Sequence, residues 1–321
     1  MKIDFKSAVQ RLQNCDDVLI LTHANPDGDT LGGAFALLQG LRQRGKRAKM
    51  HTDAPIPPRY AFLAAGCAED CFDEAYIISV DVADKKLLGG KTQALYGDRV
   101  DLSIDHHGTN RMFAKETYVE SDSASASEVV YLLLCALGVV ITKPIADCLY
   151  TGCATDTGCF RYSNVTARTH RIASELISCG ADHAQINTLM FETKKPGFLR
   201  LEQQVLSGME LYADGRICVL TITRTMLDDA DCGDEDIDEL VALSRQMEGV
   251  RIGATFKERP DGSYKLSLRT HEDVDASAIC AVFGGGGHAR AAGCSFSEDR
   301  DTALQRLLPV LRSFLKEGTA R

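Results

Sequence analysis

Hydrophobic residues occur in short blocks over the first half of the chain, and polar or glycine-containing segments separate these blocks. Four blocks have the length and the β-branched content of buried strands: 17–23, 47–52, 75–81 and 100–105. Other segments have helical periodicity: about 30–44, 125–138, 143–154 and 166–179. Strands that alternate with helices predict a parallel sheet covered on both faces, so we expect a doubly wound α/β domain.

The second half of the chain has a different pattern. Residues 189–200 combine charged residues with Pro196 and Gly197, and we interpret this segment as a linker between two domains. Beyond it the sequence predicts a mixture of helices near 198–210, 234–247, 276–282 and 299–317, with strands near 217–223, 250–257 and 264–269. We therefore expect a first domain over 1–188 and a smaller α+β domain over 201–321.

Length and charge restrict the classes of function. A chain of 321 residues with 45% hydrophobic content is long enough for two cores. The net charge of −9 argues against a surface that binds long nucleic acids, because such surfaces are normally basic. The apolar runs are also too short to cross a bilayer, so no membrane partner is expected. A phosphate-bearing ligand of this protein is therefore expected to be short and bound locally.

The cysteines indicate a reducing compartment. None of the twelve forms a C-x-x-C pair, and Cys67 and Cys71 have no matching second pair, so no structural zinc site is expected. Residues 1–17 lack the apolar run of a signal peptide. We expect free thiols and a cytoplasmic protein.

Acidic residues and histidines follow several of the predicted strands, where a parallel sheet binds its ligands. Asp156 lies in a break that glycine and threonine mark after a helix. The others come from a turn and from two strand ends: His23, Asp27, Asp29, Asp81, Asp105, His106 and His107. Helix or strand capping does not require acids and imidazoles at the ends of successive strands. The joint pattern therefore predicts a ligand-binding site.

Each of these residues also has a simpler interpretation when it is taken alone. Asp27 and Asp29 could be turn and N-cap residues, and Asp81 could cap a strand end. His106 could be a core histidine, and Asp156 could form an Asx turn.

Four carboxylates brought together would repel one another unless cations neutralise them. Two divalent cations balance the charges of Asp27, Asp29, Asp81 and Asp156. Oxygen and imidazole ligands without a thiolate suit Mn²⁺, Mg²⁺ or Co²⁺ better than a structural zinc. A pair of such ions activates water for displacement at a phosphoester.

In order and spacing, these segments resemble the DHH phosphoesterase superfamily. The matching segments are HANPDGD (23–29), VD (80–81), DHH (105–107), TGCATDTG (151–158) and FRYSNVTART (160–169). The second half resembles the DHH-associated domain through KLSLRT (265–270) and FGGGGHARAAG (283–293). Length and domain pair are similar to the nano-RNase/pAp phosphatase (NrnA-like, RecJ-like) subgroup.

The resemblance implies two Mn²⁺ sites that share Asp81. The ligands of the first site would be His23, Asp27 and Asp81. The ligands of the second would be Asp29, Asp81, His106 and Asp156. Asp105 would orient a ligating histidine, and His107 would face the scissile phosphate as a charge-stabilising or proton-donating group.

The glycine-rich segment near the C-terminus superficially matches a dinucleotide fingerprint. Only 28 residues follow Gly293, too few for the remainder of a βαβ fold, so we discard that interpretation. A loose connector remains an alternative. The resemblance implies instead that a terminal phosphate and its nucleotide bind to Arg269, Gly285, Gly286, Gly287 and His288.

The resemblance implies an enzyme that removes mononucleotides from very short RNA oligonucleotides and dephosphorylates 3′-phosphoadenosine 5′-phosphate, pAp. Two alternatives stay open: hydrolysis of cyclic or linear signalling dinucleotides at the same site, and a non-catalytic nucleotide- or RNA-binding module. A RecJ-type exonuclease fits poorly because the chain is short and acidic. A DHH-type pyrophosphatase fits poorly because its C-terminal domain lacks GGGGH. For the assembly, we consider a homodimer beside a monomer.

Overall fold

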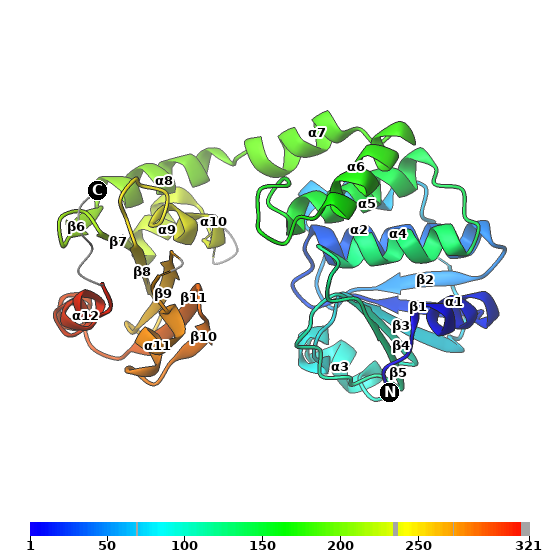
Figure 1. Ribbon diagram of the computed structural model, residues 1–321, viewed down its shortest axis with the longest axis horizontal. Coiled ribbons are helices and arrows are strands. Elements are labelled where there is room, and N and C mark those ends of the chain that lie inside the picture. Colours follow the sequence, from blue (N-terminus) through cyan, green and yellow to red (C-terminus); the bar gives the residue numbers. More distant parts are fainter. Residues whose placement is uncertain (69, 234–236, 272, 316–321) are drawn as a thin grey trace. The chain divides into compact units, whose positions relative to one another are not determined.

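The computed structural model describes residues 1–68, 70–233, 237–271 and 273–315. The chain divides into two compact units, Met1–Thr193 and Lys194–Arg321, each with its own sheet and hydrophobic core (Figure 1). The expected fold class, a parallel α/β domain followed by a smaller α+β domain, is confirmed.

The first unit contains a fully parallel sheet with the strand order β2-β1-β3-β4-β5. Its strands are β1 (Val18–Leu21), β2 (Ala48–His51), β3 (Tyr76–Val80), β4 (Leu102–Asp105) and β5 (Glu116–Val119). The chain runs from β1 outward to β2 and then returns to β3 on the other side of β1. The strand order therefore reverses between β1 and β3, the place where open α/β sheets bind ligands.

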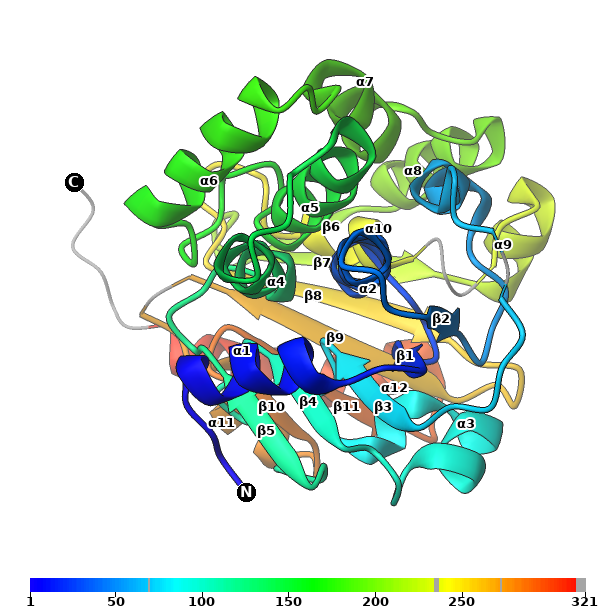
Figure 2. The ribbon, with the colours of Figure 1, turned by 90° about the vertical axis from the view of Figure 1, so that its right-hand side faces the viewer.

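Helices cover both faces of this sheet. Helix α3 (Gly90–Tyr96) lies on one face (Figures 1 and 2), next to a small apolar cluster that includes Leu19, Leu21 and Ile77. The larger core fills the other face, beneath α1 (Phe5–Asn14), α2 (Gly28–Gln43) and α4 (Ala126–Ala136). Outside these helices pack α5 (Lys143–Asp156), α6 (Ala167–Ser178) and the short α7 (His183–Asn187).

Two glycines let α5 pack closely against α2 and α4. A methyl group at Gly32 would overlap the carbonyl oxygen of Cys148, and one at Gly152 would overlap the side chain of Ser127. Without side chains at these positions, the backbones can pack in contact. This packing brings the start of α2 beside the end of α5, where Gly28 contacts Thr155.

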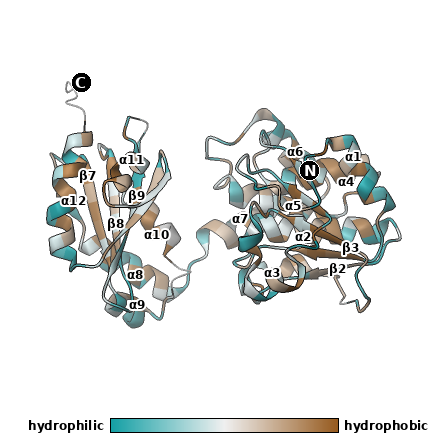
Figure 3. Cartoon of the chain, turned by 90° about the horizontal axis from the view of Figure 1, so that it is seen from below, coloured by the Kyte–Doolittle hydropathy of each residue, from teal (hydrophilic) through white to brown (hydrophobic). Residues whose placement is uncertain are grey.

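The second unit contains a mixed sheet with the order β10-β11-β9-β8-β7-β6, in which only β7 and β8 are parallel neighbours. Its strands are β6 (Glu210–Tyr212), β7 (Ile217–Ile222), β8 (Ile252–Glu258), β9 (Tyr264–Thr270), β10 (Gly286–His288) and β11 (Ala291–Phe296). Its helices are α8 (Pro196–Ser207), α9 (Arg224–Ala230), α10 (Asp238–Leu243), α11 (Ala276–Ala281) and α12 (Arg300–Phe314). Two apolar clusters fill opposite faces of this sheet, whose central strands are mainly hydrophobic (Figure 3).

Several elements differ from the sequence expectations. A π-helical turn, Thr188–Glu192, overlaps the start of the expected linker, and α8 already begins at Pro196. The helix expected over 234–247 is represented by the shorter α10, and residues 234–236 lie outside the described part of the chain. The expected C-terminal helix ends at Phe314, and residues 316–317 also lie outside that part. The boundaries 1–188 and 201–321 stay predictions.

Two further expectations concern membranes and cysteines. Within the described residues, every helix falls short of the length and apolar character that a bilayer span requires. All twelve cysteines are free thiols.

Candidate metal centre

The expected ligands from the strands meet at the edge where β1, β3 and β4 end. Asp81 follows β3 directly, and Asp105 is the last residue of β4. His23 comes two residues after β1, and His106 and His107 follow Asp105. The carboxyl ends of parallel strands share one edge, so these side chains converge at the reversal between β1 and β3.

Asp27 and Asp29 reach the same place from the start of α2. We expected both on a loop, and this was wrong for Asp29, which lies in the first turn of the helix. Asp27 is the N-cap: its Oδ1 accepts hydrogen bonds from the backbone N–H groups of Asp29 and Thr30, both at 3.0 Å. The capping interpretation is therefore confirmed, and the role of Asp27 as a metal ligand stays a prediction.

Asp156 arrives from the opposite direction. The sequence predicted that the helix ends before Asp156 and that a non-helical segment follows. This was wrong, because Asp156 is the last residue of α5. A helix continues through TGCATD because Gly152 is a packing contact with Ser127 rather than a turn residue. Helix α5 thus ends with its carboxylate directed at the strand ends, where Oδ2 lies 3.5 Å from Nε2 of His106.

Among the described residues, three overlapping sets of side chains are close enough to hold a metal ion. One consists of Asp81, Asp105, His106 and His107, and the other two contain the expected ligands. In the first of these two groups, Nε2 of His23 lies 3.6 Å from Oδ1 of Asp27 and 3.8 Å from Oδ2 of Asp81. In the second, Nε2 of His106 lies 4.0 Å from Oδ2 of Asp29 and 3.5 Å from Asp156. The Oδ1 atom of Asp81 lies 3.7 Å from the same Nε2, so Asp81 contacts both groups. These separations exceed direct hydrogen bonds and suit atoms that share a cation.

Hydrogen bonds determine which nitrogen of His106 faces the cluster. Its Nδ1 lies 3.3 Å from the carbonyl oxygen of Ser123. A carbonyl only accepts, so Nδ1 carries the proton and Nε2 presents a lone pair to the carboxylates. Among the described residues, Nε2 of His106 and Oδ1 of Asp81 are buried without a hydrogen-bond partner. Two facing acceptors with no donor fit a cation between them.

Asp29 is held by the N-terminus of α4. Its Oδ2 accepts a hydrogen bond from the N–H of Ala126 at 2.6 Å, and its Oδ1 accepts one from Ser127 at 2.8 Å. Free N–H groups at the first turn of a helix favour a negative charge. These two hydrogen bonds fix the position of the Asp29 carboxylate, and the residue is only 1% exposed.

Asp105 contacts a different histidine from the one we expected. Its Oδ1 lies 2.8 Å from Nδ1 of His107, whereas the ring of His106 is oriented by Ser123. Asp105 does accept a hydrogen bond from the backbone N–H of His106, and its Oδ2 accepts one from Nδ2 of Asn110 at 2.6 Å. The carboxylate of Asp105 therefore orients His107, whose side chain is 45% exposed, and its role in orienting a ligating imidazole stays a prediction.

Burial and mutual repulsion make the carboxylates hard to ionise together. Burial, followed by the charges of Asp29 and Asp27, raises the pKa of Asp156 to about 8. The same causes raise the pKa of Asp81 well above its usual value, and burial chiefly raises that of Asp29. Burial also acts on Asp27, but His23 and two backbone N–H groups outweigh it and lower its pKa. Such a cluster is neutralised by cations or by protons.

The backbone of Asp81 is in a left-handed conformation, with φ of 61°. Such conformations are costly for residues other than glycine and occur preferentially at functional sites. The N–H of Asp81 donates to the carbonyl of Ile104 at 2.9 Å, which holds the turn against β4. This turn places Asp81 between the two groups of ligands.

The substrate-binding residues expected in the second unit lie on its sheet. Register pairs His288 with Ala291 and Ala291 with Arg269, so His288 and Arg269 lie on the same face with β11 between them. The glycine-rich segment is not a loose connector, because Gly286 and Gly287 form the edge strand β10 with His288. Gly285 precedes this strand and packs against the backbone of Gly293.

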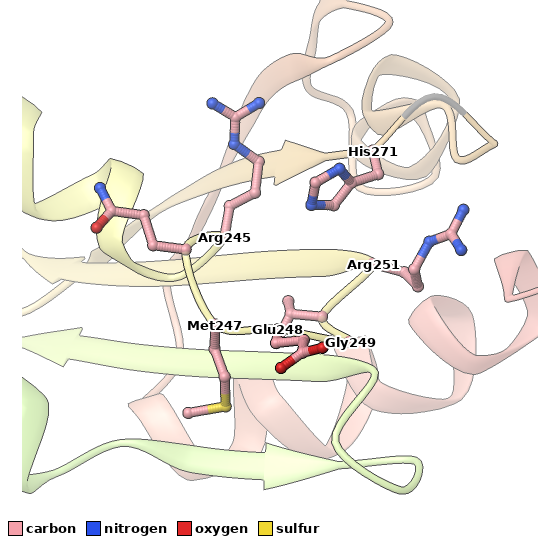
Figure 4. A pocket seen from close by; sticks show the side chains of 8 residues that line it. Arg245, Met247, Glu248, Gly249, Arg251 and His271 are labelled. Atoms are coloured by element: carbon pink, nitrogen blue, oxygen red, sulfur yellow. The ribbon is translucent and has the colours of Figure 1, made fainter.

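Sequence reasoning missed one pocket in the second unit. It has a volume of about 590 Å³, and its lining includes Arg245, Glu248, Arg251 and His271 (Figure 4). Glu248 and the two arginines give the pocket charges of both signs, and Arg251 also forms an ion pair with Asp273. No spacing in the sequence indicates it, because two segments far apart in the chain supply its lining, residues 245–251 and His271.

Two family models match this chain. The N-terminal domain of the DHH family matches residues 17–153, and the DHHA1 domain matches residues 214–317. A protein of Thermus thermophilus named bifunctional oligoribonuclease and PAP phosphatase NrnA is 33% identical over 93% of this chain and 90% of its own length. The chain belongs to the DHH phosphoesterase family. DHH proteins of this type are divalent-metal-dependent hydrolases of phosphoesters, and the acidic cluster agrees with that requirement.

Other DHH proteins show how widely the similarity extends. A cyclic-di-AMP phosphodiesterase, GdpP, of Geobacillus thermodenitrificans is 27% identical over 94% of this chain, which covers 48% of GdpP. The crystal structure of an exopolyphosphatase-related protein from Bacteroides fragilis has a TM-score of 0.85, with 24% identity over 97% of this chain and 96% of its own. The similarity to the Bacteroides fragilis structure shows a shared fold.

Proposed function

We propose that this protein is a nano-RNase and pAp phosphatase. It removes mononucleotides from very short RNA oligonucleotides and a phosphate from 3′-phosphoadenosine 5′-phosphate. The observation that carries the proposal is the pair of ligand groups joined at Asp81, in a chain 33% identical to a protein named for both activities. Two divalent cations are proposed. Carboxylate and imidazole donors without thiolates suit Mn²⁺, Mg²⁺ or Co²⁺, and we propose Mn²⁺ because the resemblance to the family implies it.

The residues that would hold one cation are His23, Asp27 and Asp81. The residues that would hold the other are Asp29, Asp81, His106 and Asp156. Bound divalent cations supply Lewis acidity toward phosphoryl oxygens and make water a better nucleophile near neutral pH.

The remaining residues are proposed to act on the substrate. The contact with Asp105 raises the pKa of His107 and favours its imidazolium form, which can stabilise charge on a phosphate or donate a proton from Nε2. In the second unit, the guanidinium of Arg269 suits bidentate binding of a phosphate. Gly285, Gly286, Gly287 and His288 are proposed to bind the same anion and its nucleotide.

The decisive experiment uses the purified full chain, stripped of metal and supplied with Mn²⁺ or Mg²⁺. Its substrates are a length ladder of RNA oligomers, pAp, and cyclic and linear signalling dinucleotides. We expect release of mononucleotides from the shortest RNAs, hydrolysis of pAp, and higher rates with Mn²⁺. Absence of product from both dinucleotides and pAp would refute the proposal.

Two other outcomes of the same assay would favour one of the alternative functions. Preference for a cyclic dinucleotide would indicate the second candidate function, which the similarity to GdpP favours. Binding of nucleotides without turnover would indicate a binding module, although such a module needs no cluster of ligands.

We assign catalysis to residues 1–188, substrate binding to residues 201–321 and the linker to 189–200. The free thiols suit a cytoplasmic protein. The homodimer is tested by light scattering, with a mass twice that of the chain as the expected result.

A further inference from the structure

The segment FRYSNVTART (160–169) belongs to the sequence resemblance, yet it contributes no candidate ligand. In the structure, three of its polar side chains contact one short stretch, residues 123–128, which includes the start of α4. These side chains are Asn164, Arg168 and Thr169.

Arg168 makes two of the contacts. Its Nη2 donates to Oγ of Ser123 at 2.9 Å, and its Nε donates to Oε1 of Glu128 at 2.5 Å. The other carboxylate oxygen of Glu128 accepts hydrogen bonds from Oγ1 of Thr169 at 3.2 Å and from the N–H of Ala124 at 3.0 Å. Glu128 is completely buried and has all of these donors around it. Such an arrangement specifies one backbone geometry for the stretch.

Asn164 ties the same stretch to a candidate ligand. Its Nδ2 donates to the carbonyl oxygen of Ala124 at 2.9 Å and to that of Asp156 at 3.2 Å. The side chain of Asn164 is exposed, so little of the hydrophobic core depends on it. Its two bonds join the end of α5 to the start of α4.

The stretch 123–128 in turn holds two candidate ligands. The carbonyl oxygen of Ser123 accepts a hydrogen bond from Nδ1 of His106. The N–H groups of Ala126 and Ser127 donate hydrogen bonds to the carboxylate of Asp29. Any shift of the stretch therefore moves an imidazole and a carboxylate of the same group.

We propose that Arg168 is a positioning residue of the metal centre. Together with Glu128 and Asn164 it fixes the stretch 123–128, and through that stretch it sets the ring of His106 and the carboxylate of Asp29. The inference rests on the proposed metal-dependent function. It gives a role to a segment of the sequence that contributes no candidate ligand.

The test measures metal affinity. Metal-free protein is titrated with Mn²⁺ while electron paramagnetic resonance follows the free ion. Arg168→Met is expected to raise the dissociation constant by about 10- to 100-fold, as loss of an outer-shell partner does. Arg168→Lys should be intermediate, since lysine keeps the charge but lacks the forked geometry. Arg171→Met, at an exposed position on the same helix, is the matched control and should bind Mn²⁺ as the wild type does.

An unchanged dissociation constant in folded Arg168→Met would overturn the inference. If circular dichroism shows that this variant does not fold, Asn164→Ala decides instead. This variant should weaken binding by about 3- to 10-fold, a smaller loss than that of a central outer-shell partner, and wild-type affinity would overturn the inference. The titration contains no substrate, so its outcome is independent of the activity assay. Wild-type protein that binds Mn²⁺ but hydrolyses neither RNA nor pAp would refute the proposed function alone.

Discussion

Oδ1 of Asp105 lies 2.8 Å from Nδ1 of His107, and the same oxygen also accepts the backbone N–H of His106 at 2.8 Å. The hydrogen bond that Nδ1 of His107 donates to Asp105 raises the pKa of His107 above its usual value. Burial would raise the pKa of Asp105, but the hydrogen bonds from His107 and Asn110 outweigh it and lower that pKa. The pair therefore favours a carboxylate beside an imidazolium at the exposed side of the cluster.

Asp105→Asn should move the pH dependence of turnover. Without the carboxylate, the pKa of His107 falls, so the alkaline limb of the pH–rate profile should shift to lower pH. The rate constant kcat at neutral pH should fall by about 10- to 100-fold. The double variant with His107→Asn should be no slower than His107→Asn alone, because Asp105 acts through His107. A profile identical to that of the wild type would contradict this role.

Asp81→Asn should abolish turnover and stabilise the metal-free protein. Asparagine tolerates the φ of 61° at this position, so the backbone is retained. A neutral amide removes one buried carboxylate from the repulsion with Asp29 and Asp27, which should raise the free energy of unfolding in EDTA by about 1 kcal/mol or more.

The checks for Asp81→Asn are the hydrolysis assay and thermal unfolding in EDTA. Asp98→Asn is the matched control, since its side chain is 90% exposed, and it should change neither measurement. Turnover at the wild-type rate in Asp81→Asn would exclude the two-cation assignment.

The stability of the metal-free protein should depend on pH through Asp156. Its pKa is about 8 in the folded state and 3.8 in the reference state, so the folded protein holds the proton more tightly between these values. The stability that this group contributes is complete below pH 3.8 and is lost as the pH rises through 8. The free energy of unfolding should fall by up to about 1.4 kcal/mol per pH unit within that window.

Asp156→Asn isolates this dependence, because asparagine does not titrate. In EDTA, the variant should become progressively more stable than the wild type between pH 5 and 8 in chemical denaturation. Saturating Mn²⁺ should reverse the order, because the wild type then gains a ligand that the variant lacks. A difference independent of pH would show that Asp156 titrates normally.

Two neighbouring glycines of the second unit should respond differently to alanine. A methyl group at Gly285 would overlap the carbonyl oxygen of Gly293 and approach the Cβ of Cys294 to 2.5 Å, whereas one at Gly286 meets open space. Gly285→Ala should therefore lower the free energy of unfolding by about 1–3 kcal/mol, and Gly286→Ala by less than about 0.5 kcal/mol. Equal stability in a thermal melt would show that the packing around Gly285 is looser than observed.

The ordering of elements was predictable from the sequence because it follows local periodicity. The apolar runs at 75–81 and 100–105 correspond to β3 and β4, and the pattern over 143–154 corresponds to α5. Strand β5 was missed, because its alternating residues Glu116–Val119 are too few to give a distinct signal. Helix α5 was expected to end before Asp156, because Gly152 signals a break locally but serves as a close contact in the fold.

The sequence by itself determined which chemistry is available. Acids and imidazoles at successive strand ends of a parallel sheet must gather at one edge, whatever the details of packing. Only the tertiary structure decided which residues contact and orient one another. It directs Asp105 to His107, gives His106 a carbonyl partner from Ser123, and uses the start of α4 to hold Asp29. These contacts join residues far apart in the chain, and no local pattern encodes them because they depend on how α2, α4 and α5 pack together.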